Sequence, residues 1–66
     1  MKRRYLISEM LANIEEYVPS ARNRTILKLI YIDDLSYERI AEIYDLSTRT
    51  IDNIVRDFKD TAPIFR

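Results

Sequence analysis

The sequence contains no cysteine, no histidine and no glycine among its 66 residues. Without cysteine or histidine the chain has no thiol nucleophile and no imidazole base, and it lacks the ligands that zinc fingers and haem proteins use. Without glycine it has no glycine-rich loop to hold a phosphate group, and two-residue hairpin turns are disfavoured. We therefore expect no metal ion, no cofactor and no enzymatic activity.

A large excess of charge of either sign is also missing. Eleven basic and eleven acidic residues give a formal net charge of zero, which argues against a polybasic nucleic-acid tail and against a membrane-surface segment. The charges are distributed unevenly: residues 1–28 hold six basic against three acidic groups, residues 29–48 one against five, and residues 49–66 four against three. Because neutralisation of phosphates supplies most non-specific DNA affinity, a neutral monomer should bind DNA weakly by itself.

The amino terminus has no long hydrophobic run. Lys2, Arg3 and Arg4 are similar to the charged start of a signal peptide, but Ser8 and Glu9 interrupt the apolar stretch that follows them. We therefore expect no signal peptide, no membrane span and a cytoplasmic location. With 47% hydrophobic and 33% charged residues, the chain has the composition of a soluble globular protein, and its length suits a single domain over residues 1–66.

Apolar residues recur at helical spacing along the whole chain. The clearest stripe is formed by Ile51, Ile54, Val55 and Phe58, which fall at positions i, i+3, i+4 and i+7. Serines at the starts of the later segments are suitable helix caps, and the two prolines act as helix stops. The sequence therefore predicts an all-α fold of three to four helices, at residues of about 4–18, 20–32, 36–44 and 48–59.

The last two predicted helices have the pattern of a helix-turn-helix. Ala41 is a small residue at the position where the second helix of such a unit crosses the first, with Ile40 beside it. Asp45 stands where the turn requires a left-handed backbone, which is usually supplied by glycine and which aspartate tolerates. Leu46 follows to pack the turn into the core, and Ile51 anchors the second helix.

The outer face of this second helix carries polar side chains suited to DNA. Arg49 can pair with guanine, Asn53 with adenine, and Asp52 can accept from the cytosine amino group, whereas other members of the face suit phosphates. Each residue also has an ordinary interpretation, such as a helix cap or an i, i+4 surface ion pair. The full set of expected DNA-binding residues is Ser47, Thr48, Arg49, Asp52, Asn53 and Arg56.

Two stretches of the chain resemble region four of bacterial sigma factors. One runs from Val18-Pro19 through the apolar segment ending at Tyr31, and the other contains Leu35-Ser36-Tyr37-Glu38-Arg39-Ile40-Ala41 followed by Leu46-Ser47-Thr48-Arg49-Thr50-Ile51. The resemblance implies promoter-type DNA recognition by the last helix, with contacts at Thr48, Arg49, Asp52, Asn53 and Arg56, and docking on RNA polymerase. Asp45 in place of the turn glycine and Arg39 in place of a second glutamate depart from the family pattern. No other sigma region is present, so we do not expect a complete sigma factor.

Two functions remain open from the sequence. The first is a sequence-specific, double-stranded DNA-binding transcription regulator from a bacterium, phage or plasmid, with Arg22, Arg24 and Lys28 as further phosphate contacts. The second is a protein-interaction module that binds RNA polymerase or a sigma factor with little DNA contact, which the acidic middle of the chain favours. The apolar tail residues Ile64 and Phe65 either mediate a homodimer or fold back onto their own core.

Overall fold

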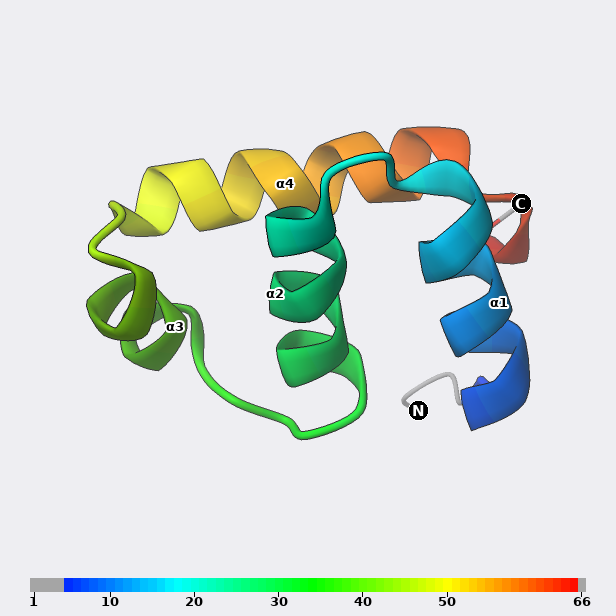
Figure 1. Ribbon diagram of the computed structural model, residues 1–66, viewed down its shortest axis with the longest axis horizontal. Coiled ribbons are helices and arrows are strands. Elements are labelled where there is room, and N and C mark those ends of the chain that lie inside the picture. The colour runs from blue at the N-terminus through cyan, green and yellow to red at the C-terminus, as the bar shows by residue number, and fades with distance from the viewer. Residues whose placement is uncertain (1–4, 66) are drawn as a thin grey trace.

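The computed structural model describes residues 5–65 and shows a bundle of four helices. These are α1 (Ile7–Tyr17), α2 (Ala21–Tyr31), α3 (Tyr37–Tyr44) and α4 (Thr48–Thr61), followed by a short 3-10 turn, η1 (Pro63–Phe65) (Figure 1). No strand occurs within this described range. The expected all-α fold class is confirmed. The range expected for the first helix starts at residue 4, which lies outside the described residues, but residues 5 and 6 are not helical and α1 begins at Ile7. Helix α4 extends two residues beyond its expected end.

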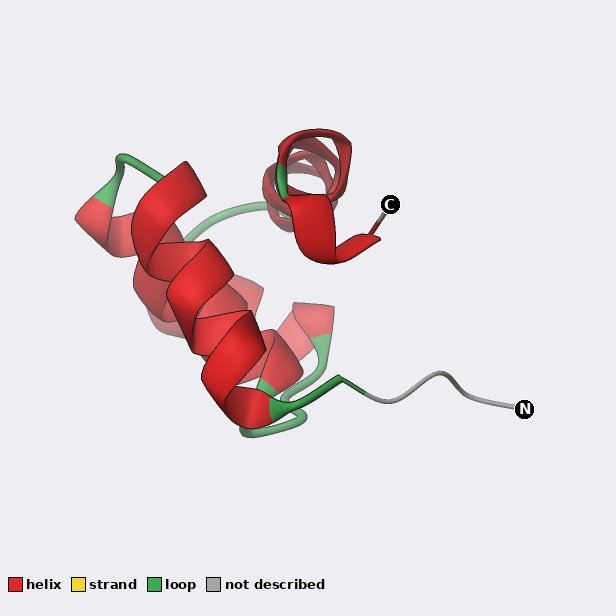
Figure 2. Ribbon diagram, turned by 90° about the vertical axis from the view of Figure 1, so that its right-hand side faces the viewer, coloured by secondary structure: helices red, strands yellow, loops and turns green. Residues whose placement is uncertain are grey.

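Helix α4 is the element against which the others are arranged. In Figure 1 it runs along one edge of the molecule, with α3 beside its first turns, α2 near its middle and α1 near its last turns. Figure 2 views α4 nearly end on and shows the other three helices on one side of it. One face of α4 is therefore covered by the bundle, and its opposite face is left open.

Serine caps fix the starts of three helices. In each case the serine backbone is extended and its side-chain oxygen accepts a hydrogen bond from the backbone N–H three residues later. This bond satisfies one of the N–H groups that the first helical turn leaves unpaired. The three bonds join Ser20 to Asn23 (3.3 Å), Ser36 to Arg39 (3.2 Å) and Ser47 to Thr50 (3.1 Å).

Two aspartates adopt the left-handed backbone conformation that glycine normally supplies. Asp45, at the end of α3, has φ of 54° and ψ of 47°, as the sequence predicts for the helix-turn-helix turn. Asp34, between α2 and α3, has φ of 57°. Asp34 falls between the predicted helices 20–32 and 36–44, and its left-handed geometry is an additional finding.

All four helices and the segments beside them contribute to a single hydrophobic core. Its fully buried side chains include Ile14 from α1, Ile26 and Leu27 from α2, Ile40 from α3 and Ile51 from α4. Complete burial of an aliphatic side chain of this size contributes roughly 1.5–3 kcal/mol to folding. No polar or charged residue is buried within residues 5–65.

The carboxyl-terminal tail packs against the core of its own chain. The ring of Phe65 lies 5.3 Å from that of Phe58 and 5.9 Å from that of Tyr31, measured between centroids. The backbone N–H of Ile64 donates to Asn13 Oδ1 at 3.3 Å. Of the two expectations for the tail, the structure supports the folded-back one, and these contacts leave the tail largely engaged within its own chain. As predicted, the α-helix stops before Pro63, because α4 ends at Thr61. Pro63 itself begins η1, since proline fits the first position of a helical turn.

Candidate nucleic-acid interface

Helices α3 and α4 form a helix-turn-helix in which the turn is closed by backbone hydrogen bonds. The N–H of Leu46 donates to the carbonyl oxygen of Ala41 at 2.9 Å, which the left-handed conformation of Asp45 makes possible. Ala41 is buried at the crossing of the two helices, together with Ile40 and Ile51. This packing fixes the orientation of α4 relative to the rest of the domain.

The two faces of α4 differ sharply in chemistry. The inward face is the predicted stripe, and all its members are buried: Ile51, Ile54, Val55 and Phe58. Since Arg49 and Asn53 are one turn apart and about half a turn around the helix from Ile51, they lie on the opposite face, and both are exposed. An exposed arginine and asparagine at this spacing present two side chains capable of bidentate hydrogen bonding to base edges.

The first turn of α4 is held by Ser47 and Thr50. In addition to its capping bond, the Ser47 hydroxyl lies 2.9 Å from the hydroxyl of Thr50. The Ser47 side chain is thus occupied by the helix end, whereas Thr48 beside it is exposed. Thr50 was not among the residues expected at the site, although its spacing of three from a capping serine is the signal that identifies it.

Asp52 and Arg56 form an ion pair along α4. The distance from Arg56 Nε to Asp52 Oδ2 is 2.9 Å, and the two side chains are 73% and 41% exposed respectively. Asp52 is close enough to Tyr37 of α3 for its charge to act on the phenol. Partial burial raises the pKa of the Tyr37 phenol, and the negative charge of Asp52 raises this pKa further. Asp52 therefore has two neighbours within its own chain.

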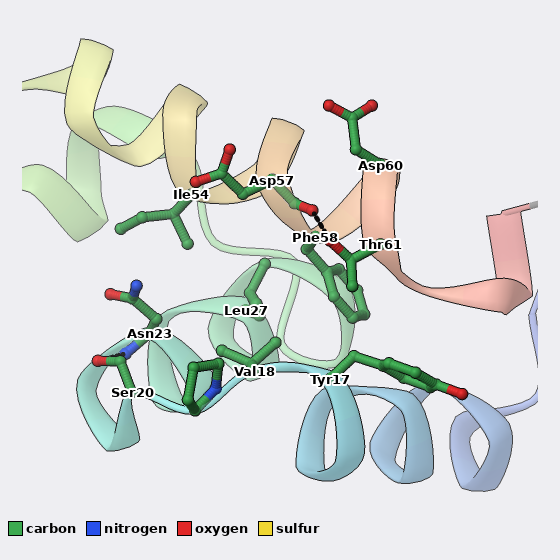
Figure 3. A pocket seen from close by; sticks show the side chains of 11 residues that line it. Tyr17, Val18, Ser20, Asn23, Leu27, Ile54, Asp57, Phe58, Asp60 and Thr61 are labelled. Atoms are coloured by element: carbon green, nitrogen blue, oxygen red, sulfur yellow. Dashed lines mark hydrogen bonds between the residues drawn. The ribbon is translucent and has the colours of Figure 1, made fainter.

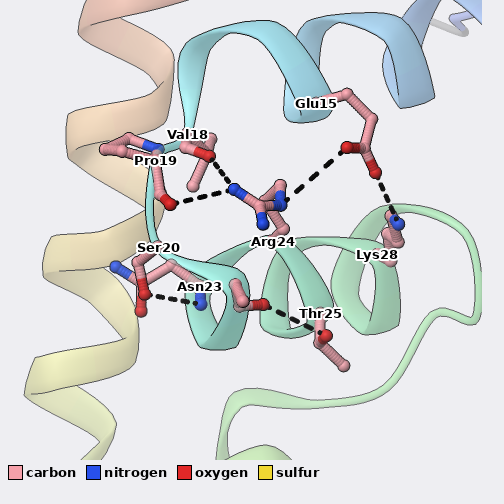
Figure 4. A network of polar contacts seen from close by, with 9 residues as sticks. Glu15, Val18, Pro19, Ser20, Asn23, Arg24, Thr25 and Lys28 are labelled. Carbon is pink, nitrogen blue, oxygen red and sulfur yellow. Dashed lines mark hydrogen bonds and ion pairs between the residues drawn. The ribbon is translucent and has the colours of Figure 1, made fainter.

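Arg24 and Lys28 are turned toward α1 (Figure 4). The Nη1 of Arg24 donates to the carbonyl oxygens of Val18 and Pro19, at 2.8 and 2.9 Å, where α1 has just ended. Lys28 Nζ donates to Glu15 Oε1 at 3.1 Å, and Arg24 Nε lies 3.9 Å from Glu15 Oε2. The hydrogen bond from Lys28, and then its positive charge, lower the pKa of the Glu15 carboxyl.

The three basic residues expected to contact phosphates thus differ in their surroundings. Arg24 and Lys28 connect α2 to α1 and are only partly exposed, with their charged groups bonded within the chain. Arg22 is exposed at the start of α2, where its Nε donates to Asn23 Oδ1 at 3.1 Å. Sequence spacing could not distinguish the exposed Arg22 from the bonded Arg24, because the carbonyl oxygens that accept from Arg24 lie just after the end of another helix, α1.

A groove with a volume of 390 Å³ lies between the α1–α2 connection and the second half of α4 (Figure 3). Its apolar lining includes Val18, Leu27, Ile54 and Phe58. Asp57 and Asp60, both exposed, stand on the α4 side of it. The groove therefore combines an apolar floor with negative charge at its edge. No group of three or more His, Cys, Asp or Glu side chains within residues 5–65 is arranged to hold a metal ion.

Comparison with known protein families identifies the helix-turn-helix. A family model described as Sigma-70, region 4 matches residues 20–57, which is more than half of the chain. The chain belongs to the sigma-70 region 4 family. This result confirms the resemblance seen in the sequence.

The matched residues of this region 4 domain extend from the cap of α2 into the second half of α4, so α1 and η1 lie outside the match. The family is one of DNA-binding helix-turn-helix domains and is not a family of enzymes. No curated protein and no solved structure matches the chain. None of the helices among residues 5–65 has the length and hydrophobicity needed to cross a membrane.

Proposed function

We propose that this region 4 domain is a sequence-specific DNA-binding transcription regulator whose α4 enters the major groove. The observation that carries the proposal is the pair Arg49 and Asn53, which project from the open face of α4 while the opposite face is fixed in the core. Arg49 suits the O6 and N7 atoms of guanine, and Asn53 suits the N6 and N7 atoms of adenine. A recognition helix needs this combination of exposed side chains that contact bases and a rigid support that holds them in place.

Phosphate contacts would come from groups around these two residues. The amino terminus of α4 presents backbone N–H groups that have no partner inside the helix, and these groups favour an anion. Thr48 beside them adds an exposed hydroxyl, Ser47 completes the same turn, and Arg22 is an exposed cation at the start of α2. Since the net charge of the chain is zero, we expect modest affinity for a single copy. Two copies bound to one site would gain affinity through their effective concentration.

The test starts with selection of bound duplexes from a random DNA pool, followed by measurement of affinity for the selected duplex and for an unrelated one. Arg49→Ala and Asn53→Ala should each weaken binding to the selected duplex by roughly 5- to 150-fold, and should change binding to the unrelated duplex much less. Lys59→Ala is the matched control, because Lys59 is an exposed cation two to three turns further along α4. It should weaken binding to both duplexes equally. The proposal fails if the parent chain shows no sequence preference, or if neither substitution reduces that preference.

The groove favours a second candidate function, which is binding to RNA polymerase or to a sigma factor. Its apolar floor and the carboxylates of Asp57 and Asp60 fit a segment that carries both apolar and basic side chains. The zero net charge is also better suited to a protein partner than to tight DNA binding alone. This use of the groove would leave Arg49 and Asn53 available to DNA at the other end of α4.

The second candidate is tested by titrating the labelled chain with purified RNA polymerase in the absence of DNA. Asp57→Lys should abolish or strongly weaken that binding by placing a positive charge at the groove, whereas Arg49→Ala should leave it unchanged. Polymerase binding that Asp57→Lys leaves unchanged, or no binding at all, would exclude the groove as a polymerase site.

A further inference from the structure

The ion pair on α4 places an internal carboxylate beside a cation that DNA phosphates would otherwise attract. Arg56 is 73% exposed, and its Nε lies 2.9 Å from Asp52 Oδ2. An arginine on a recognition helix raises the affinity of the protein for any duplex when it neutralises one phosphate. To do so here, Arg56 would have to leave Asp52, and the carboxylate would then be left facing the negative backbone of the DNA.

The position of Asp52 favours a role toward Arg56 over a role toward bases. Asp52 is half-buried and lies about a quarter turn around the helix from the buried Ile51, whereas Arg49 and Asn53 are exposed and lie on the outermost face. Its negative charge also reaches the phenol of Tyr37 on α3. The Asp52 carboxylate is paired with Arg56 of the same helix.

We propose that Asp52 is a positioning residue that restrains Arg56 and thereby suppresses binding to unrelated DNA. The proposal rests on the proposed function, in which the open face of α4 meets the major groove. On unrelated DNA the protein can shift until some phosphate comes within reach of an unrestrained arginine. On the selected duplex the contacts of Arg49 and Asn53 fix the register, so a freed Arg56 gains less. The pair therefore increases the ratio of specific to non-specific affinity without contacting a base.

The test compares Asp52→Asn with Asp57→Asn on the selected and the unrelated duplex over a series of salt concentrations. Both substitutions remove one negative charge from α4, but the structure pairs only Asp52 with Arg56. For the unrelated duplex, Asp52→Asn should raise affinity about two- to threefold near 0.1 M salt, which is as much as the release of an exposed i, i+4 pair allows, and should steepen the slope of log affinity against log salt by at most about 0.9. Asp57→Asn should raise affinity clearly less, and adding Arg56→Ala to Asp52→Asn should cancel the gain.

Several outcomes would overturn the proposal. Equal effects of Asp52→Asn and Asp57→Asn would show that only the overall charge of the helix matters. A changed base preference in a DNA selection repeated with Asp52→Ala would make Asp52 a base reader instead. Both outcomes leave the proposed function intact if Arg49→Ala still removes sequence preference. Absence of DNA binding by the parent chain would overturn the proposed function and this inference together. Because an exposed i, i+4 pair contributes little to folding, the variants should melt close to the parent chain.

Discussion

Substitution of Arg24 by alanine tests whether this side chain is structural or is a DNA contact. Its Nη1 donates to two carbonyl oxygens, of Val18 and Pro19, just after α1 ends. The last carbonyls of a helix have no partner within the helix, and a cation nearby also interacts favourably with the negative end of the helix dipole. Arg24→Ala should therefore destabilise the connection between α1 and α2.

The expected loss can be worked out from the surroundings of each bond. A hydrogen bond that involves a charged group contributes about 1.5–3 kcal/mol when it is shielded from water. The bond to Val18 is partly buried and counts toward this range, whereas water can replace the exposed bond to Pro19. The contact with Glu15, at 3.9 Å and well exposed, adds a few tenths of a kcal/mol at most. We expect a loss of about 2 kcal/mol in the free energy of unfolding, or about 8–16 °C in melting temperature for a domain of this size.

The assay is thermal and urea unfolding followed by circular dichroism. Arg22→Ala is the control, because Arg22 lies two residues away, is exposed, and bonds only to the neighbouring Asn23 among the described contacts. It should change the free energy of unfolding by less than about 0.5 kcal/mol. Arg24→Lys keeps the positive charge but lacks the planar guanidinium group with its fixed N–H donors. It should therefore recover only part of the free energy of unfolding that Arg24→Ala loses. If Arg24→Ala melts like Arg22→Ala, Arg24 does not stabilise the α1–α2 connection, and a loss of DNA affinity worth one phosphate contact would then make it a DNA contact.

Two further predictions concern the core and the response to pH. Ala41→Leu should overpack the crossing of α3 and α4 and reduce the free energy of unfolding by about 1–3 kcal/mol or more; an unchanged urea midpoint would contradict the packing described at that crossing. Burial is the main cause that raises the pKa of Tyr31 from 10.0 to about 12, so the folded state favours the protonated phenol. The resulting stability is present below about pH 10 and is lost as the pH rises toward about 12. Tyr31→Phe should lose less stability across that interval, and an equal loss in both proteins would exclude Tyr31 as the cause.

Local sequence signals were sufficient for the fold because each helix is specified within a few residues. Ser20, Ser36 and Ser47 form the caps that their side chains predict, since a capping bond spans only three residues. Asp45 adopts the left-handed conformation that the helix-turn-helix pattern requires. Asp34 adopts the same conformation without being predicted, because two consecutive aspartates indicate a break but do not indicate its geometry.

Features that depend on contacts between distant segments could not be predicted. Arg24 was expected to contact phosphates, and its bonds to the end of α1 become visible only when α1 and α2 pack together. The sequence left two positions open for the tail, and the hydrogen bond from Ile64 to Asn13, which supports the folded-back one, joins residues 51 positions apart. At the candidate interface, helical periodicity placed Arg49 and Asn53 on the open face, while the effect of the Asp52 charge on Tyr37 of α3 required the packed structure.

The edge-to-face contact between Tyr5 and Phe65, with centroids 5.3 Å apart, brings the two ends of the described chain together. The same Phe65 ring touches Phe58 and Tyr31, so loosening either end exposes part of one shared aromatic cluster. We therefore expect the two ends to fray as one cooperative unit, with matched rates of amide hydrogen exchange. This unit lies near the last turns of α4, whereas the turn that joins α3 to α4 lies at the other end of the helix (Figure 1). Its opening need not disturb the first turns of α4.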